Sequence, residues 1–195
     1  MDIIKQQLLN RPILKSRQEV LQSPCPIPKA PGIYAWYFKE VPPGVPTEGC
    51  HCYNEYTLLY IGISPKAPPV NGGKPSSQTI RSRLRYHYNG NAEGSTLRLT
   101  LGCLLSDNLN IQLRRVGSGK RLTFGRGEEA LSDWMNQNAF ITWSEYPTPW
   151  EPEEELIKSL YLPLNLDQNQ HHPFYRGLKE IRRQAKAEAK SLPII

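Results

Sequence analysis

Two tyrosines of this chain each stand close to a glycine in a short apolar and aromatic stretch. One lies in Gly32-Ile33-Tyr34, within residues 31–38, and the other in Tyr60-Ile61-Gly62, within residues 58–63. Aromatic and β-branched residues bounded by glycine or proline favour strands, and a strand can hold a tyrosine by its ring while its hydroxyl stays available. If the strands pair, the two hydroxyls lie on one face. Two ordinary core strands are the alternative interpretation, because short motifs often match by chance.

A guanidinium and an imidazole stand one turn apart in a predicted helix. The helix is expected over residues 79–90, with Thr79 as its N-cap and a typical ending at Asn89-Gly90. Arg83 and His87 are four residues apart, so they share one face. Arginines on this helix suit contacts with phosphate groups, or they form a solvated basic face. The other two arginines of this stretch are Arg81 and Arg85.

An acidic cluster opens a later predicted helix. Between positions 145 and 155 the chain has five glutamates and no basic residue. Pro152 suits a first helical turn and the helix dipole favours acids there, so capping charge alone explains the cluster. Capping does not explain the Leu156-Ile157-Lys158 run and the Pro163-Leu164-Asn165 run that follow. The glutamates are Glu145, Glu151, Glu153, Glu154 and Glu155.

Two further segments are basic. Residues 111–124 are typical of a hairpin, which can lie along a nucleic-acid backbone or be an ordinary soluble hairpin. Residues 174–190 predict a basic helix that either contacts phosphates or is a solvated tail. The basic residues in and next to the hairpin are Arg114, Arg115, Lys120, Arg121 and Arg126.

These elements predict an α/β (α+β) fold with a small mixed or antiparallel three-stranded sheet flanked by helices. Residues 139–143 would give the third strand, residues 128–136 a further helix, and residues 1–22 a helix interrupted at Pro12. Residues 97–105 fit either a strand or a helix, and a helix is favoured because Ser95 or Thr96 could cap it. We expect an N-terminal helical extension over residues 1–30, a catalytic domain over 31–168 and a basic C-terminal helix over 169–195.

Composition sets the broad class of the protein. The 195 residues carry a formal net charge of +6 with a sequence pI near 9.2, which mildly favours a polyanionic partner. We expect no membrane-spanning segment and no secretion signal. The four cysteines form no dense framework and indicate a reduced, cytoplasmic protein, and the spacing of Cys50-His51-Cys52 does not fit a zinc knuckle.

Taken in order, the paired tyrosine motifs, the helical arginine, the glutamate and the asparagine resemble the GIY-YIG nuclease family. The resemblance runs from Pro31 to about Asn165. The long interval between the two tyrosines, residues 39–56, is similar to the restriction-endonuclease branch. One departure is Ile63, where some members of the family have a lysine.

The resemblance implies a site residue by residue. It places the catalytic tyrosines at Tyr34 and Tyr60, the arginine at Arg83 and, by similarity to the restriction-endonuclease branch, a histidine at His87. The metal-binding glutamate falls three residues before Leu156 and twelve before Asn165, and both counts give Glu153. Glu154 and Glu155 are therefore not the expected ligands.

This resemblance implies a Mg²⁺-dependent (or Mn²⁺-dependent) nuclease acting on DNA, with RNA not excluded. Arg83 would neutralise phosphate charge, and His87 would take a proton from Tyr34, which would in turn take one from water. Beyond the catalytic residues, Arg81, Arg85, Arg114, Arg115, Lys120 and Arg121 are candidate nucleic-acid contacts. A non-catalytic nucleic-acid-binding module on the same scaffold is the alternative. A homodimer would allow cleavage of both strands.

Overall fold

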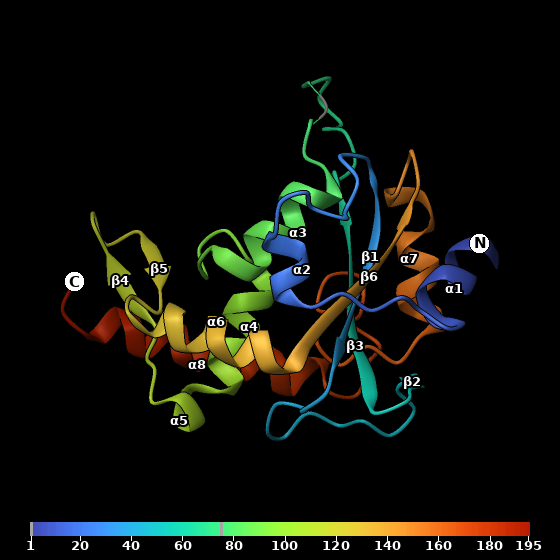
Figure 1. Ribbon diagram of the computed structural model, residues 1–195. Helices are drawn as coiled ribbons and strands as arrows, with labels where there is room; N and C mark the ends of the chain where they lie inside the picture. The colour runs from blue at the N-terminus through green and yellow to red at the C-terminus, as the bar shows by residue number, and fades with distance from the viewer. Residues whose placement is uncertain (1, 75) are drawn as a thin grey trace.

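A four-stranded antiparallel sheet forms the centre of the protein (Figure 1). The structure is a computed structural model that describes residues 2–74 and 76–195. The strand order is β2-β3-β1-β6, with β1 at Gly32–Phe38, β2 at Cys52–Tyr53, β3 at Tyr56–Ser64 and β6 at Ala139–Glu145. Both expected tyrosine strands are therefore present, and they pair with each other.

The central strand β1 is buried on both of its faces. Tyr34, Trp36 and Phe38 point into one core, while Ile33, Ala35 and Tyr37 point into a second core on the other side. Alternation of this kind is the normal geometry of a strand, so one fully apolar strand can serve two layers of helices.

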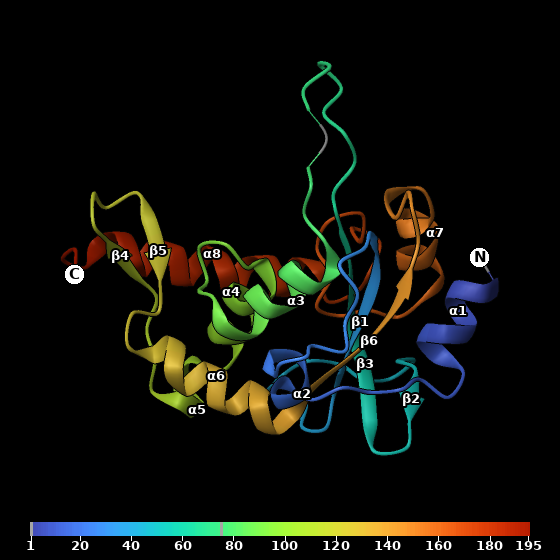
Figure 2. The same ribbon diagram turned by 45° about the horizontal axis from the view of Figure 1, so that its top comes forward.

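Helices cover both faces of the sheet (Figures 1 and 2). The first core is covered by α2, α3, α4 and α6, and the second by α1 and α7. The bounds are α1 Asp2–Leu9, α2 Arg17–Leu21, α3 Ile80–Asn89, α4 Thr96–Leu104, α6 Gly127–Asn138 and α7 Trp150–Ser159.

The long basic helix α8, Tyr175–Ser191, packs against α4 and runs towards a small hairpin (Figure 2). The hairpin consists of β4, Arg114–Val116, and β5, Arg121–Thr123, and a short helix α5, Ser106–Leu109, precedes it. Leu178 and Ala189 of α8 are buried. The tail helix expected from the sequence is therefore docked on the body of the protein.

One expectation needs correction. The sheet has four strands where three were predicted, because Cys52 and Tyr53 at the end of the 39–56 loop turn back through Asn54 (φ 53°) and pair with β3. The break expected at Pro12 is present between α1 and α2. The left-handed Arg11 (φ 56°) contributes to it, and Lys15 forms a bridge with Ile141 at the sheet edge.

No helix in the described part of the chain is both long enough and apolar enough to cross a bilayer.

The buried ion pair of Arg98 and Glu128 ties α3, α4 and α6 together. Arg98 is fully buried on α4, and it donates to the Glu128 carboxylate at 2.8 and 3.0 Å. The same guanidinium also donates to the carbonyls of His87 and Tyr88, both at 3.3 Å. The pair thereby fixes the end of the helix that carries Arg83.

Replacing Glu128 with alanine should lower the free energy of unfolding by about 3–5 kcal/mol, because it leaves the Arg98 charge buried without a counter-charge. Denaturant unfolding monitored by circular dichroism measures this loss. The control is Glu55→Ala, whose partner Lys39 is 57% exposed and which should cost less than about 1 kcal/mol. Equal losses in both variants would contradict a central role for the buried pair.

Candidate active site

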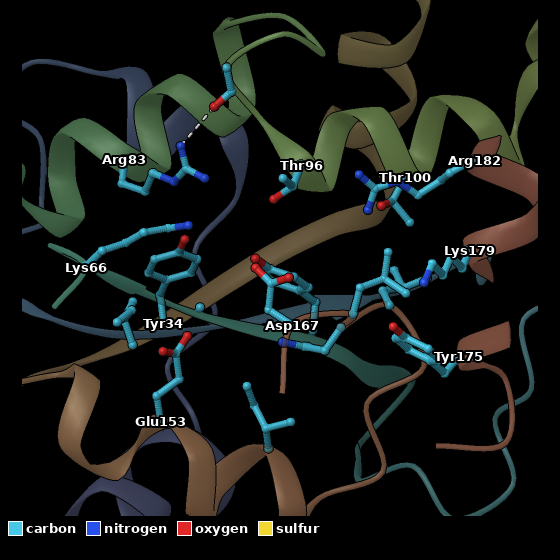
Figure 3. A pocket seen from close by; sticks show the side chains of 18 of the residues that line it. Tyr34, Lys66, Arg83, Thr96, Thr100, Glu153, Asp167, Tyr175, Lys179 and Arg182 are labelled. Atoms are coloured by element: carbon cyan, nitrogen blue, oxygen red, sulfur yellow. Dashed lines mark hydrogen bonds between the residues drawn. The ribbon is translucent and has the colours of Figure 1, made fainter. Parts of the chain in front are cut away.

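A cavity of about 800 Å³ lies beside the sheet where β1, β3, α3 and α7 approach one another (Figure 3). Its lining contains five of the residues expected from the sequence: Tyr34, Tyr60, Arg83, Glu153 and Asn165. These residues come from segments up to 131 positions apart, as the numbers 34 and 165 show. The sixth, His87, lies behind Tyr34 and does not line the cavity.

The two tyrosine motifs meet in the strand register. Tyr34 of β1 is paired with Gly62 of β3, and Tyr60 is paired with Trp36. Paired residues share a face, and residues two apart in a strand share it too, so both phenols project to the same side. A methyl group at Gly62 would lie 2.6 Å from the Tyr34 hydroxyl oxygen. Gly62 therefore leaves the space in which the Tyr34 phenol lies.

A chain of polar contacts leads away from the Tyr34 hydroxyl into the protein. His87 Nε2 lies 3.0 Å from the Tyr34 oxygen, and His87 Nδ1 lies 2.7 Å from Ser95 Oγ. Burial is the main reason why the pKa of Tyr34 is raised above its usual value, with the neighbouring Tyr60 adding to the effect. Burial, then Arg83 and Arg98, holds the pKa of His87 well below its usual value. The pair thus rests as neutral phenol and neutral imidazole.

Arg83 brings a permanent positive charge to the rim of the cavity. Its guanidinium donates to the carbonyl oxygen of Gly94 at 2.9 Å (Figure 3). Capping by Thr79 fixes the start of α3, since its side chain accepts from the backbone of Ser82. Arg83 also offsets part of the rise in the pKa of Tyr34 and of Tyr60. The guanidinium is therefore electrostatically coupled to both phenols.

Glu153 is a partly buried carboxylate on the first turn of α7. Burial raises its pKa to about 7, with Lys66 opposing and Asp167 adding to the rise. Its hydrogen-bond donor is Gln168 Nε2, at 3.5 Å from Oε2. Figure 3 shows the carboxylate directed from α7 towards Tyr34. Within residues 2–74 and 76–195, no salt bridge involves Glu153.

This environment fits a bound cation. A desolvated carboxylate without a paired lysine or arginine gains most from a divalent ion, and Mg²⁺ typically uses one or two carboxylates together with waters and phosphate oxygens. No group of three or more His, Cys, Asp or Glu side chains gathers as a ready-made metal site among the described residues. A cation at Glu153 would therefore depend on water and substrate oxygens for most of its ligands.

Asn165 acts on the site through the backbone. Its Nδ2 donates to the Ile61 carbonyl at 2.9 Å, and its Oδ1 accepts from the Ile61 N–H at 3.0 Å. These two bonds join the segment after α7 to β3, one residue from Tyr60. Asn165 therefore holds this segment against the strand that carries Tyr60.

The six expected nucleic-acid contacts lie outside the cavity lining. Arg114 and Arg115 donate to backbone carbonyls of Pro193, Ala189 and Leu192 in the C-terminal segment. Arg81 likewise donates to the carbonyls of Ile27 and Cys25. The other three, which are exposed, are Arg85, Lys120 and Arg121. Their role as contacts stays a prediction.

Sequence reasoning left several lining residues unassigned. The cavity wall opposite α7 includes cationic residues of α8, and Lys66 enters from the 64–77 loop (Figure 3). The sequence indicated Phe174, Leu178 and Ile181 as residues that could dock this helix, and they do pack against the body of the protein. The basic composition of residues 174–190 did not indicate which of its cations would line the cavity. The unassigned polar residues of the lining include Lys66, Thr96, Thr100, Asp167, Tyr175, Lys179, Arg182, Arg183 and Lys186.

The Gly62→Ala variant should unfold with a free energy about 1–3 kcal/mol lower than the parent, because the new methyl group overlaps the Tyr34 phenol. Urea unfolding measures the change. Gly177→Ala is the matched control, since a methyl there would meet Phe174 at an ordinary 3.6 Å and should be neutral or stabilising. If the Gly62→Ala variant unfolds with the same urea midpoint as the parent, the close packing of Gly62 and Tyr34 would be contradicted.

Replacing Glu153 with glutamine should stabilise the metal-free protein at alkaline pH. Burial raises the pKa of Glu153 in the folded state from 4.5 to about 7, so proton binding to this carboxyl favours folding. The stabilisation by the bound proton is fully present below pH 4.5 and is lost as the pH rises through about 7. Glutamine stays neutral, so the variant should gain on the order of 2 kcal/mol near pH ~8 and nothing near pH ~4. Thermal melts in chelator at both pH values measure the difference.

The matched control for this prediction is Glu154→Gln. Glu154 is exposed and pairs with Lys158 at 2.6 Å, which lowers its pKa. Its replacement should give no gain at alkaline pH. A pH-independent change in the Glu153→Gln variant would show that the carboxylate is not desolvated in the folded protein.

Comparison with known proteins agrees with this geometry. Residues 32–184, more than half of the chain, match the family model described as the GIY-YIG catalytic domain. No curated protein and no solved structure matches the chain. The matched range contains all six expected catalytic residues and most of α8, and it confirms the expected family and fold class. Domains of this family are endonucleases that act on nucleic acids. The chain belongs to the GIY-YIG nuclease family.

Proposed function

We propose that this protein is a divalent-metal-dependent endonuclease that hydrolyses phosphodiester bonds of DNA. The observation that supports it best is the convergence of Tyr34, Tyr60, Arg83 and Glu153 on one cavity of about 800 Å³. Two phenols, a guanidinium and a desolvated carboxylate are suited to water activation, phosphate binding and cation binding respectively. RNA remains an outcome of the substrate test, because phosphate contacts carry no base information.

In this proposal, water attacks the scissile phosphorus and one P–O bond to the leaving oxygen breaks. Tyr34 takes the proton of the attacking water while its own hydroxyl proton moves to His87 Nε2, 3.0 Å away. Nδ1–H of His87 would then donate to Ser95 Oγ, at 2.7 Å, which leaves Nε2 as the acceptor. Arg83 binds the non-bridging oxygens, where charge develops.

Glu153 is the residue that would hold Mg²⁺ or Mn²⁺. When bound, such a cation supplies positive charge for the phosphate and the leaving oxygen. Burial raises the pKa of Tyr34 and so disfavours loss of its proton, which is why added positive charge near this phenol would help the reaction. Asn165 keeps Tyr60 and the segment after α7 in register through Ile61.

The partly buried carboxylate of Glu153 argues against a purely binding role. A module that only binds polyanions gains nothing from a desolvated carboxylate whose pKa is raised to about 7 in its main cavity. Such a group repels phosphate when ionised and costs folding free energy. A cation that joins carboxylate and phosphate accounts for its position.

The four cysteines are free. We therefore propose a reducing, cytoplasmic location. One site per chain cuts one strand at a time, so we also propose that cleavage of both strands needs two copies of the chain.

Glu153→Gln should abolish cleavage, with a loss of at least about a hundredfold, because it removes the only acid of the α7 cluster that lines the cavity. Conversion of supercoiled plasmid to nicked and linear forms, with Mg²⁺ or with chelator, measures the activity. Nicked product that precedes linear product would indicate single-strand cuts.

The neighbouring Glu154→Gln variant is the control for cleavage, since it is exposed on the same helix and should cut at the parent's rate. Cleavage by Glu153→Gln at the parent's rate would disprove the site assignment. A parent that binds DNA and does not cut any DNA or RNA with Mg²⁺ or Mn²⁺ would favour the binding module instead.

A further inference from the structure

The guanidinium of Arg182 enters the cavity from α8, at the right of Figure 3. The residue is partly buried. Burial lowers the pKa of its guanidinium, and nearby Cys103, Asp167 and Tyr60 act against that change. Arg182 is thus electrostatically coupled to Tyr60, which belongs to the proposed catalytic group. Arg182 is not one of the six site residues expected from the family's motif, so its presence in the cavity needs a separate explanation.

Arg182 differs from the other partly buried arginines in having no acceptor in the protein. In the described part of the chain, no hydrogen bond or ion pair to its guanidinium is present, whereas every other partly buried arginine donates to a carbonyl or a carboxylate. A partly desolvated guanidinium without an acceptor is costly unless a ligand supplies one. The partly buried arginines that have protein acceptors are Arg17, Arg81, Arg83, Arg114 and Arg115, and the fully buried Arg98 has acceptors too.

The neighbours of Arg182 on α8 extend the positive charge along the same wall. Lys179 and Lys186 lie three residues before it and four after it, so they share its face, and both line the cavity. The adjacent Arg183 is exposed and already bound by Glu180 at 2.6 and 2.7 Å. Among the described residues, the cations of this wall without a hydrogen bond or ion pair are therefore Arg182 and the two lysines.

We propose that Arg182, flanked by Lys179 and Lys186, forms a second phosphate-binding subsite that holds the backbone of the nucleic-acid strand beside the scissile bond. The proposal rests on the nuclease function above and adds the path of the substrate, which enters between α3 and α8. A planar, permanently charged fork matches the paired oxygens of a phosphodiester. The subsite contacts phosphate away from the reacting atoms, so it contributes to substrate binding and strand position.

The test measures binding separately from cleavage. Labelled duplex and single-stranded DNA are titrated by fluorescence anisotropy in chelator, at several salt concentrations, with the parent and with Arg182→Gln. We expect Arg182→Gln to weaken binding about tenfold and to reduce the slope of log affinity against log salt by about 1. Arg182→Lys keeps the charge and should restore the slope, but only part of the affinity.

Arg176→Gln is the matched control, because it removes the same charge from an exposed position of the same helix outside the cavity lining. It should change the affinity less than about twofold. Thermal melts confirm that each variant is folded. An equal effect of Arg182→Gln and Arg176→Gln, or an unchanged salt slope in Arg182→Gln, would overturn the subsite.

Cleavage assays on the same variants separate the two proposals. If Arg182→Gln raises KM and leaves kcat within about twofold of the parent's value, the result supports both the nuclease function and the phosphate-binding subsite. If the parent cleaves DNA and Arg182→Gln binds and cleaves DNA as the parent does, the subsite is overturned and the nuclease function stands. A parent that binds DNA through Arg182 and cleaves nothing would overturn the nuclease and leave the subsite. Tight binding of inorganic phosphate alone, with no binding of DNA or RNA, would overturn both.

Discussion

The phenol of Tyr34 lies across Gly62, and this contact ties together the two motifs around which the site is built. The register pairs the two residues on β1 and β3, and no side chain larger than hydrogen fits beneath the ring. Because side chains alternate along a strand, a slip of one residue would turn Tyr34 into the opposite core. The fixed register therefore places both phenols on the side where α3 brings Arg83 and His87.

Burial then decides the resting charges of the site. It raises the pKa of Tyr34 and of Glu153 and lowers that of His87, so the folded protein favours the neutral forms of these groups beside the cationic side chains of α3 and α8. A cavity with this balance attracts an anion first. A phosphate brings negative charge next to Glu153, and a cation that bridges the two then becomes favourable. Substrate and metal are thus expected to bind cooperatively at this position.

Local sequence patterns were sufficient to predict most of the helices and strands and the positions of the motif residues. Apolar runs next to glycine predicted β1 and β3. Thr79 marked the start of α3, and Ser95 or Thr96 marked that of α4. The two-residue strand β2 has no local signal, because its pairing depends on the turn at Asn54. The convergence of Glu153 with Tyr34 could be expected only by resemblance, since nothing between them in the sequence sets their distance.

The arginines show why composition is a weak guide to a binding surface. The hairpin and the α3 helix carry arginines that look alike in sequence, but Arg81, Arg114 and Arg115 each donate to carbonyl oxygens of the chain. Whether a guanidinium is available to a ligand depends on whether the fold brings an acceptor to it, which is a long-range property. Loop and C-terminal carbonyls reach these three, and none reaches Arg182 among the described residues. A partly buried guanidinium without a protein acceptor among the described residues consequently faces the cavity, where a phosphate can supply the missing acceptor.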